Sequence, residues 1–177
     1  DDWPMRNLFV VRLESAPPVE STFGVAGSGL WRFLGVYFDA LPDPEDELQL
    51  RRRFVQHFVS LRHDYLPESA IDIEKEYQHW SHALGRPAMV YSRENEIDLA
   101  QVVGLRGAYC AYLSRTVVAP ATQPAYLVIG NNDAYRLYLN GELVHETEEC
   151  TWWTPFNNAH PVTLHQGPNH LLVKLLK

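Results

Sequence analysis

The sequence predicts a mainly β fold in which antiparallel strands build a sandwich or a barrel, with one helical insertion near residues 44–62. Many short apolar or alternating segments follow residue 67, separated by Gly, Pro and Asn, and this spacing is typical of all-β domains. The pair Asn140-Gly141 between two alternating segments indicates a type I′ hairpin turn. The helical insertion is expected to be the only long helix, because the period of the apolar residues changes there.

The first strands are expected near the start of the chain. Residues 7–13 form an apolar segment before a loop rich in Pro and Ser, and the apolar run over residues 30–38 indicates a buried strand. Residues 1–25 are expected to be an N-terminal extension or an edge strand. Residues 1–177 are enough to bury one core, so we expect a single domain.

The helical insertion has a start signal and an apolar face. Asp43 can cap a helix that has Pro44 in its first position. Leu50, Phe54 and Phe58 then recur at helical spacing, so one face can pack against a core or dock a partner.

The strands that follow end in a hairpin and a terminal strand. Tyr135 and Leu137 are expected on one buried face of the hairpin, and Arg136 and Tyr138 on the other face. In the terminal strand Lys174 lies between two apolar residues, so we expect it to face solvent or to reach water from the sheet edge.

Composition excludes some function classes. The net charge of -7 and the pI near 5.6 disfavour nucleic-acid binding, which needs basic residues to neutralise phosphates. We expect no membrane span, because no apolar run approaches the roughly 20 residues required. Cys110 and Cys150 are interpreted either as one disulfide or as small buried thiols.

Several segments together resemble a known family. They include "GLWRFLGVYFDAL", "IDLAQVVG", "AYLVIGNNDAYRLYLNGELVHE" and "PVTLHQGPNHLLVKL". The closest local match is an Asn-Asp loop, a strand ending in Asn-Gly, and a Gly-x-Asn turn before an aliphatic strand with a Lys. Here these residues are Asn132, Asp133, Asn140, Gly141, Gly167, Asn169 and Lys174. The order of segments resembles the galactose-binding-like jelly-roll modules of bacterial carbohydrate-active enzymes, such as the sugar-binding domain of family 2 glycoside hydrolases.

The resemblance implies a two-sheet jelly-roll β-sandwich with a glycan-binding or accessory role beside a catalytic domain. The expected partners are a glycan or oligosaccharide and a neighbouring glycoside hydrolase domain. The compartment stays open, with an extracellular or cell-surface location favoured. Asn140 and Asn169 are interpreted as turn residues without a ligand.

Two polar loops supply the candidate ligand-binding residues. Exposed indoles stack on sugar rings while amides and carboxylates bind hydroxyl groups. The candidates in these loops are Trp152, Trp153, Asn132, Asp133, Asn157 and Asn158. One tryptophan of the pair is expected to plug the sandwich, because adjacent residues of an extended chain face opposite ways. The Asn-Asp loop also suits an Asx turn or a structural calcium ion, although calcium is not indicated.

Signals for catalysis are weak, and no catalytic residue is assigned. His79 and His82 follow Glu76 at helical spacing, but surface histidines explain them better than a metal site does. Glu94, Glu96 and Asp98 form a carboxylate cluster, which favours a small sugar-active enzyme as one alternative. A purely structural interaction domain is the other alternative, and Trp31 and Trp80 are expected in the core.

Overall fold

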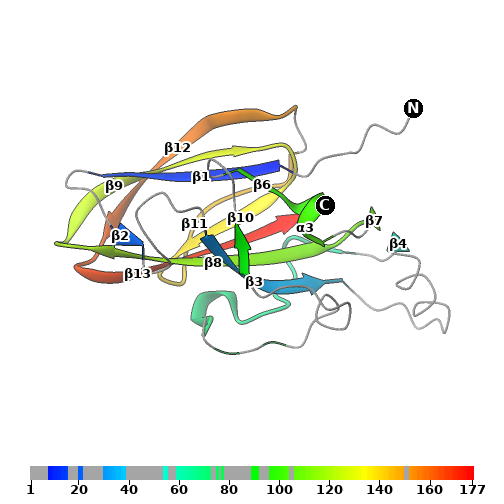
Figure 1. Ribbon diagram of the computed structural model, residues 1–177, viewed down its shortest axis with the longest axis horizontal. Coiled ribbons are helices and arrows are strands. Elements are labelled where there is room, and N and C mark those ends of the chain that lie inside the picture. The colour runs from blue at the N-terminus through cyan, green and yellow to red at the C-terminus, as the bar shows by residue number, and fades with distance from the viewer. Residues whose placement is uncertain are drawn as a thin grey trace.

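Two antiparallel sheets form most of the protein. The computed structural model describes residues 8–15, 20–21, 30–38, 54–55, 59–72, 75, 77, 89–91, 96–103, 106–149 and 152–177. The sheets lie in two layers, which confirms a mainly β, sandwich-like architecture (Figure 1). No helix in these described residues is both long and apolar enough to cross a bilayer.

The smaller sheet has four strands. Their order is β12 (Thr154–Leu164), β9 (Gln123–Asn131), β1 (Leu8–Ser15) and β6 (Glu96–Asp98). The expected first strand is confirmed as β1, but the expectation of an edge strand is wrong, because β1 pairs with β9 on one side and β6 on the other. The chain therefore places its first described strand inside a sheet.

The larger sheet has seven strands. The path runs through β11 (Glu142–Thr147), β10 (Tyr135–Leu139), β13 (Gly167–Leu176), β8 (Cys110–Ala119), β3 (Leu30–Tyr37) and β5 (Met89–Tyr91). The two-residue strand β2 (Glu20–Ser21) also pairs with β8. The hairpin of β10 and β11 and the terminal strand β13 confirm the predictions for those segments.

The predicted helix over residues 44–62 is wrong where the structure describes that range. Phe54 and Val55 form β4 (Phe54–Val55), which pairs in parallel with β7 (Arg106–Gly107), and the chain turns at Leu61. Residues 44–53 and 56–58 lie outside the described residues. Apolar residues at helical spacing also suit an irregular segment that covers a sheet, and Leu61 is buried in this way.

Short helical elements lie at two other places. The α3 helix (Leu99–Val103) follows β6, and its start is capped by Asp98, whose Oδ1 accepts a hydrogen bond from the Ala100 amide at 3.1 Å. The 3₁₀ helix η1 (Glu68–Ala70) lies in the segment of residues 59–72, which we call the covering segment.

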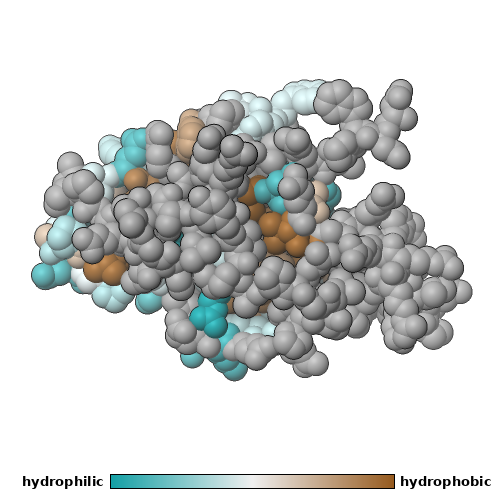
Figure 2. Space-filling view, in the orientation of Figure 1, coloured by the Kyte–Doolittle hydropathy of each residue, from teal (hydrophilic) through white to brown (hydrophobic). Residues whose placement is uncertain are grey.

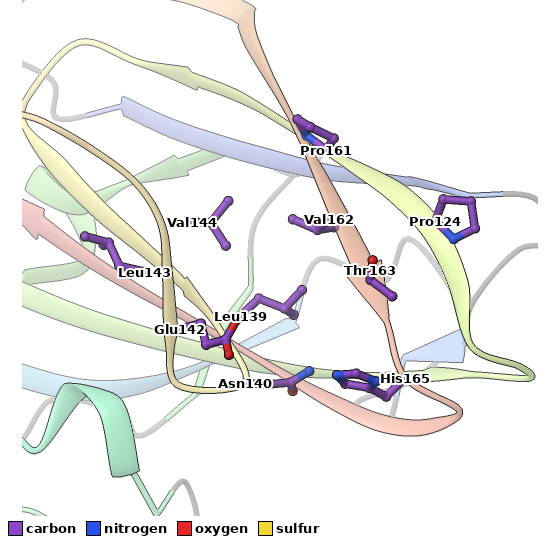
Figure 3. Close-up of a pocket in the computed structure, with 10 residues that line it drawn as sticks. All are labelled: Pro124, Leu139, Asn140, Glu142, Leu143, Val144, Pro161, Val162, Thr163 and His165. Atoms are coloured by element: carbon purple, nitrogen blue, oxygen red, sulfur yellow. The ribbon is translucent and has the colours of Figure 1, made fainter.

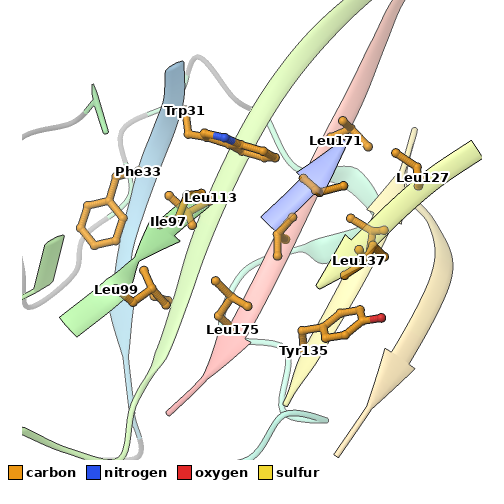
Figure 4. Close-up of a cluster of buried hydrophobic side chains, with 14 of the residues drawn as sticks. Trp31, Phe33, Ile97, Leu99, Leu113, Leu127, Tyr135, Leu137, Leu171 and Leu175 are labelled. Atoms are coloured by element: carbon orange, nitrogen blue, oxygen red, sulfur yellow. The ribbon is translucent and has the colours of Figure 1, made fainter. Parts of the chain in front are cut away.

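The main core lies between the two sheets (Figure 4). Trp31, Leu113 and Leu137 enter it from the seven-stranded sheet, and Leu127 enters it from the four-stranded sheet. Trp31 is buried as predicted, whereas Trp80 lies outside the described residues. Alternation gives the long strands of both sheets one side that faces this core.

The outer face of the seven-stranded sheet is buried as well. Leu34, Tyr112, Tyr138 and Leu172 form a second cluster there with Leu66 of the covering segment. The β10 strand of the hairpin thus has two buried faces rather than the one that its sequence predicts. Burial on both faces explains why β8 is buried along almost its whole length.

The hairpin turn fits closely under the covering segment. Asn140 and Gly141 have positive φ angles of 52° and 83°, which confirms the backbone predicted for this turn. A Cβ atom at Gly141 would lie 2.3 Å from the backbone oxygen of Ser69. Gly141 is therefore required both by its φ angle and by the contact with η1.

Candidate functional site

The tryptophan pair lies at the start of β12, and its two members differ in exposure. Trp152 is 93% exposed, whereas Trp153 is partly buried. This is the difference expected for neighbours on an extended chain. Figure 2 shows the described residues on one face as small hydrophobic patches among hydrophilic ones. Trp152 is the most exposed of the large hydrophobic side chains in the described residues.

The Asn-Asp loop lies at the same end of the four-stranded sheet as Trp152. Asn131, the last residue of β9, pairs with Thr154 of β12, and Asn132 and Asp133 follow directly. The side-chain amide of Asn131 also donates to the backbone oxygen of Asp133 at 2.9 Å, and this hydrogen bond stabilises the loop. Burial raises the pKa of the Asp133 carboxyl, and Lys177 opposes that shift. The two predicted loops are therefore neighbours, and their contact with a ligand stays a prediction.

A β-bulge lies near the start of β12. Pairing with β9 shifts register between Thr154 and Asn158, and Phe156 within the bulge has a φ angle of 54°. A bulky side chain is uncommon in this left-handed region, and such conformations gather at functional sites. Phe156 is 36% exposed and Asn158 is partly buried, while the side chain of Asn157 lies outside the described residues. We call Trp152, Phe156, Asn132, Asp133 and Asn158 the aromatic end.

A cleft of about 900 Å³ lies elsewhere, between β11 and β12 (Figure 3). Each of these is an edge strand of its sheet, so the cleft lies where one edge of each sheet comes together. One wall comes from the hairpin and consists of Leu139, Asn140, Glu142, Leu143 and Val144. The other comes from β12 and its surroundings and consists of Pro124, Pro161, Val162, Thr163 and His165. We call this site the edge cleft.

Two stacked histidines join the sheets next to the edge cleft. The rings of His145 on β11 and His160 on β12 have centroids 4.0 Å apart. The Tyr135 hydroxyl lies 2.9 Å from His145 Nδ1, and burial raises the pKa of this tyrosine to about 12. Burial, with a smaller contribution from His145, lowers the pKa of His160. Both causes disfavour the charged form of His160.

A buried ionic cluster lies under the covering segment, and sequence reasoning missed it. Lys174 is fully buried, and its Nζ donates to Glu68 Oε1 at 2.8 Å and to the backbone oxygen of His63. The same Nζ lies 5.3 Å and 5.5 Å from the ring centroids of Tyr65 and Tyr112. The expectation that Lys174 faces solvent is wrong, because the covering segment buries that face of β13.

Glu68 is the centre of this cluster. The Tyr112 hydroxyl donates to Glu68 Oε1 at 2.5 Å, the Tyr138 hydroxyl donates to Oε2, and Arg136 Nη1 lies 3.3 Å from Oε2. Burial alone would raise the pKa of Glu68, but the hydrogen bonds from Lys174, Tyr112 and Tyr138 outweigh it and lower the pKa. Burial and Glu68 together raise the pKa of both tyrosines. The arrangement stabilises a charged carboxylate and two neutral phenols, and it attaches the covering segment to the sheet. We call Glu68, Lys174, Tyr112, Tyr138 and Arg136 the structural pin.

The other candidates from the sequence are placed less completely. Asp98 of the carboxylate cluster caps α3, while Glu94 and the side chain of Glu96 lie outside the described residues. Glu76, His79 and His82 also lie outside them. Among the residues described, no group of three His, Cys, Asp or Glu side chains is arranged to hold a metal ion.

Cys110 is buried, and its Sγ lies 3.7 Å from the Ser60 backbone oxygen. Cys150 lies outside the described residues, so pairing of the two cysteines stays open.

Asn140 and Asn169 serve the turns, as their chemistry predicts. The side-chain amide of Asn140 donates to Asn169 Oδ1 at 2.9 Å, and Asn140 Oδ1 accepts a hydrogen bond from the backbone N–H of His170 at 2.8 Å. Asn169 also donates to the His165 backbone oxygen at 2.8 Å. These bonds tie the hairpin turn to the turn that precedes β13.

Comparison of the chain with protein-family models, with curated proteins and with solved structures finds no match.

Proposed function

We propose that this protein is a non-catalytic carbohydrate-binding or accessory module, with jelly-roll connectivity, that works beside a glycoside-active domain. The observation that carries the proposal is the exposure of Trp152 at the end where the Asn-Asp loop also lies. An indole that is 93% exposed leaves its ring faces open to stack on a ligand. The resemblance of the sequence to galactose-binding-like modules supports the same ligand class.

The aromatic end has the two kinds of group that a sugar ring requires. The flat faces of Trp152 and Phe156 can cover the apolar C–H face of a pyranose ring. The side-chain oxygens and amides of Asn132, Asp133 and Asn158 can bind its hydroxyl groups, since a hydroxyl both donates and accepts. The bulge at Phe156 re-aims side chains at this end, as bulges near binding sites often do.

The role given to Asp98 supports a binding module over an enzyme. A glycosidase needs two carboxyl groups that are free to exchange protons about 5 to 10 Å apart. Asp98 instead uses an oxygen to cap α3, and Glu68 is enclosed by the structural pin. Both of these carboxylates are committed to holding the backbone in place.

A glycan array with paired variants tests the proposal. We expect the parent protein to bind at least one glycan class and Trp152→Ala to lose about tenfold or more in affinity, because stacking contributes up to about 1.5 kcal/mol beyond the buried area. Tyr126→Ala is the matched control, since Tyr126 is 53% exposed on β9 and lies outside the aromatic end.

Each variant must first have the same melting temperature as the parent protein, which shows that the substitution leaves the fold intact. Equal loss in Trp152→Ala and Tyr126→Ala, or no glycan bound by the parent, would contradict the proposal. Binding by the parent that only Trp152→Ala loses would identify the platform.

A further inference from the structure

The edge cleft exposes backbone groups that a ligand can use. In the part of the chain that the structure describes, β11 pairs only with β10, and β12 only with β9. An edge strand directs a row of N–H and C=O groups away from its partner strand. Glu142, Leu143 and Val144 of β11 line one wall and Pro161, Val162 and Thr163 of β12 line the other, so each wall includes part of such an edge, with both donors and acceptors.

These edges are poorly suited to pairing with another strand. Pro161 lies in the β12 wall and has no N–H group to donate. On β11, Leu137 pairs with His145 and Tyr138 with Leu143, so Val144 is an extra, bulged residue. Prolines and bulges are the devices by which edge strands avoid strand addition. An extended peptide is therefore a poor occupant.

The side chains of the edge cleft add a polar rim to an apolar floor. Val144 and Val162 extend from opposite walls toward the interior (Figure 3) and pack against the main core. The exposed polar side chains are Asn140, Glu142, Thr163 and His165. The carboxylate of Glu142, in a chain of net charge -7, disfavours an anionic ligand.

We propose that the edge cleft is a second binding site, which takes a neutral oligosaccharide. A polyhydroxylated ligand matches mixed rows of N–H and C=O groups because each hydroxyl both donates and accepts. The volume of about 900 Å³ lies within the range of small-molecule sites. The proposal rests on the proposed function for the ligand class, but its site is distinct from the aromatic end.

The two sites lie toward opposite ends of β12. Thr154 pairs beside the Asn-Asp loop, whereas Thr163 and His165 line the edge cleft. Nine residues of strand correspond to roughly 30 Å, or somewhat less across the bulge. The amides of the two sites are therefore far apart, and binding at each site can be observed separately.

NMR titration of the ¹⁵N-labelled full chain provides the test. The probes are the neutral hexasaccharides of cellulose, xylan, mannan, chitin and amylose, with sorbitol as a non-sugar polyol control. We expect saturable shifts of the amides of Glu142, Leu143 and Thr163 with at least one hexasaccharide, and none with sorbitol at the same concentration. These shifts should persist in Trp152→Ala, which removes the platform of the other site.

Two pairs of variants locate the binding. Glu142→Gln should weaken binding at the edge cleft by about tenfold, since a hydrogen bond to a charged group is worth about 1.5–3 kcal/mol. Glu149→Gln, at an exposed position outside the cleft, should leave it unchanged. Thr163→Phe should block the cleft, whereas Ala159→Phe, at an exposed position on the same strand, should not.

The outcomes separate this proposal from the proposed function. Shifts at the cleft amides in Trp152→Ala support the second site. Shifts confined to the aromatic end and lost in Trp152→Ala overturn the second site and leave the proposed function standing. Shifts at the cleft alone support the second site and overturn the platform role of Trp152. A parent protein that responds to no hexasaccharide overturns both.

Discussion

The two faces of the seven-stranded sheet are buried by different chemistry. On the inner face, side chains such as Leu113, Leu137 and Val173 meet the four-stranded sheet in an apolar core. On the outer face, Lys174 meets the covering segment through a buried carboxylate, surrounded by phenol rings. Apolar packing tolerates many arrangements of similar volume, whereas a buried charge needs one specific partner. The inner face thus supplies stability, and the outer face fixes where the covering segment lies.

The largest expected loss of stability comes from replacing Lys174, one member of the structural pin. Lys174→Met removes the fully buried cation that pairs with Glu68 and leaves only the longer, partly exposed contact with Arg136, so we expect a loss of about 3–5 kcal/mol in the free energy of unfolding. Urea denaturation monitored by tryptophan fluorescence measures this loss. Glu149→Gln, an exposed carboxylate change, should stay within about 0.5 kcal/mol of the parent.

The double variant Glu68→Leu/Lys174→Met sharpens the comparison. It removes both charges, so we expect it to recover about half of the loss, the rest reflecting phenol groups left without an acceptor. A double variant whose loss equals the sum of the two single losses would show that the pair is not energetically coupled.

A substitution on the inner face should have a slightly smaller effect. Leu137→Ala removes a fully buried side chain from the core, and we expect a loss of about 3 kcal/mol. Leu143→Ala on the same hairpin is the control, because Leu143 is 45% exposed and should lose less than about 1 kcal/mol. Amide hydrogen exchange of both variants should show whether the covering segment stays protected. Loss of protection there in Leu137→Ala at native conditions would contradict the separation of the two faces.

Gly141→Ala tests the contact between the hairpin turn and the covering segment. The new methyl group would meet the Ser69 oxygen and would sit at a φ angle of 83°, so we expect a loss of about 1–2 kcal/mol. Gly167→Ala is the matched control, since it also has a positive φ angle but has no atom within 4 Å of the added carbon. Thermal unfolding of the two variants separates the contact from the backbone strain. Equal losses would mean that the contact with Ser69 contributes nothing.

The smallest expected effect is a dependence of the free energy of unfolding on acidic pH. Glu68 has a folded-state pKa below its ordinary value of 4.5, so its pairing stabilises the fold above that pH. The contribution should be lost as the pH falls from 4.5 through the lowered folded-state pKa. Urea denaturation at a series of pH values from 7 to 3 should show a shallower acid slope for Glu68→Leu/Lys174→Met than for the parent. Identical slopes would assign the acid dependence to other groups.

Local patterns predicted much of the inner face. Alternation placed Tyr135 and Leu137 in the core, and the Asn140-Gly141 pair predicted a turn with two positive φ angles. These features depend on residues that are close in sequence, so a short window contains the whole signal. The exposure of Trp152 and partial burial of Trp153 follow from the same alternation.

The outer face and the edge cleft were not predicted, because they depend on distant residues. Lys174 and Glu68 are 106 positions apart, and the pattern around Lys174 shows only that it leaves the inner face. Whether a covering segment buries that second face cannot be read from β13. Likewise Glu142 and Thr163 are ordinary strand residues until sheet order brings β11 and β12 to the open side.

The position of β13 has a consequence for synthesis on the ribosome. This strand lies between β10 and β8, and it carries Lys174, which forms the ion pair with Glu68. In the nascent chain one side of β8, one side of β10 and the Glu68 carboxylate therefore lack their partner until residues 167–176 have emerged. Pairings this distant in sequence form slowly, and the waiting strands expose apolar surface. Emergence of β13 from the ribosome thus marks the moment at which both faces of the large sheet can close.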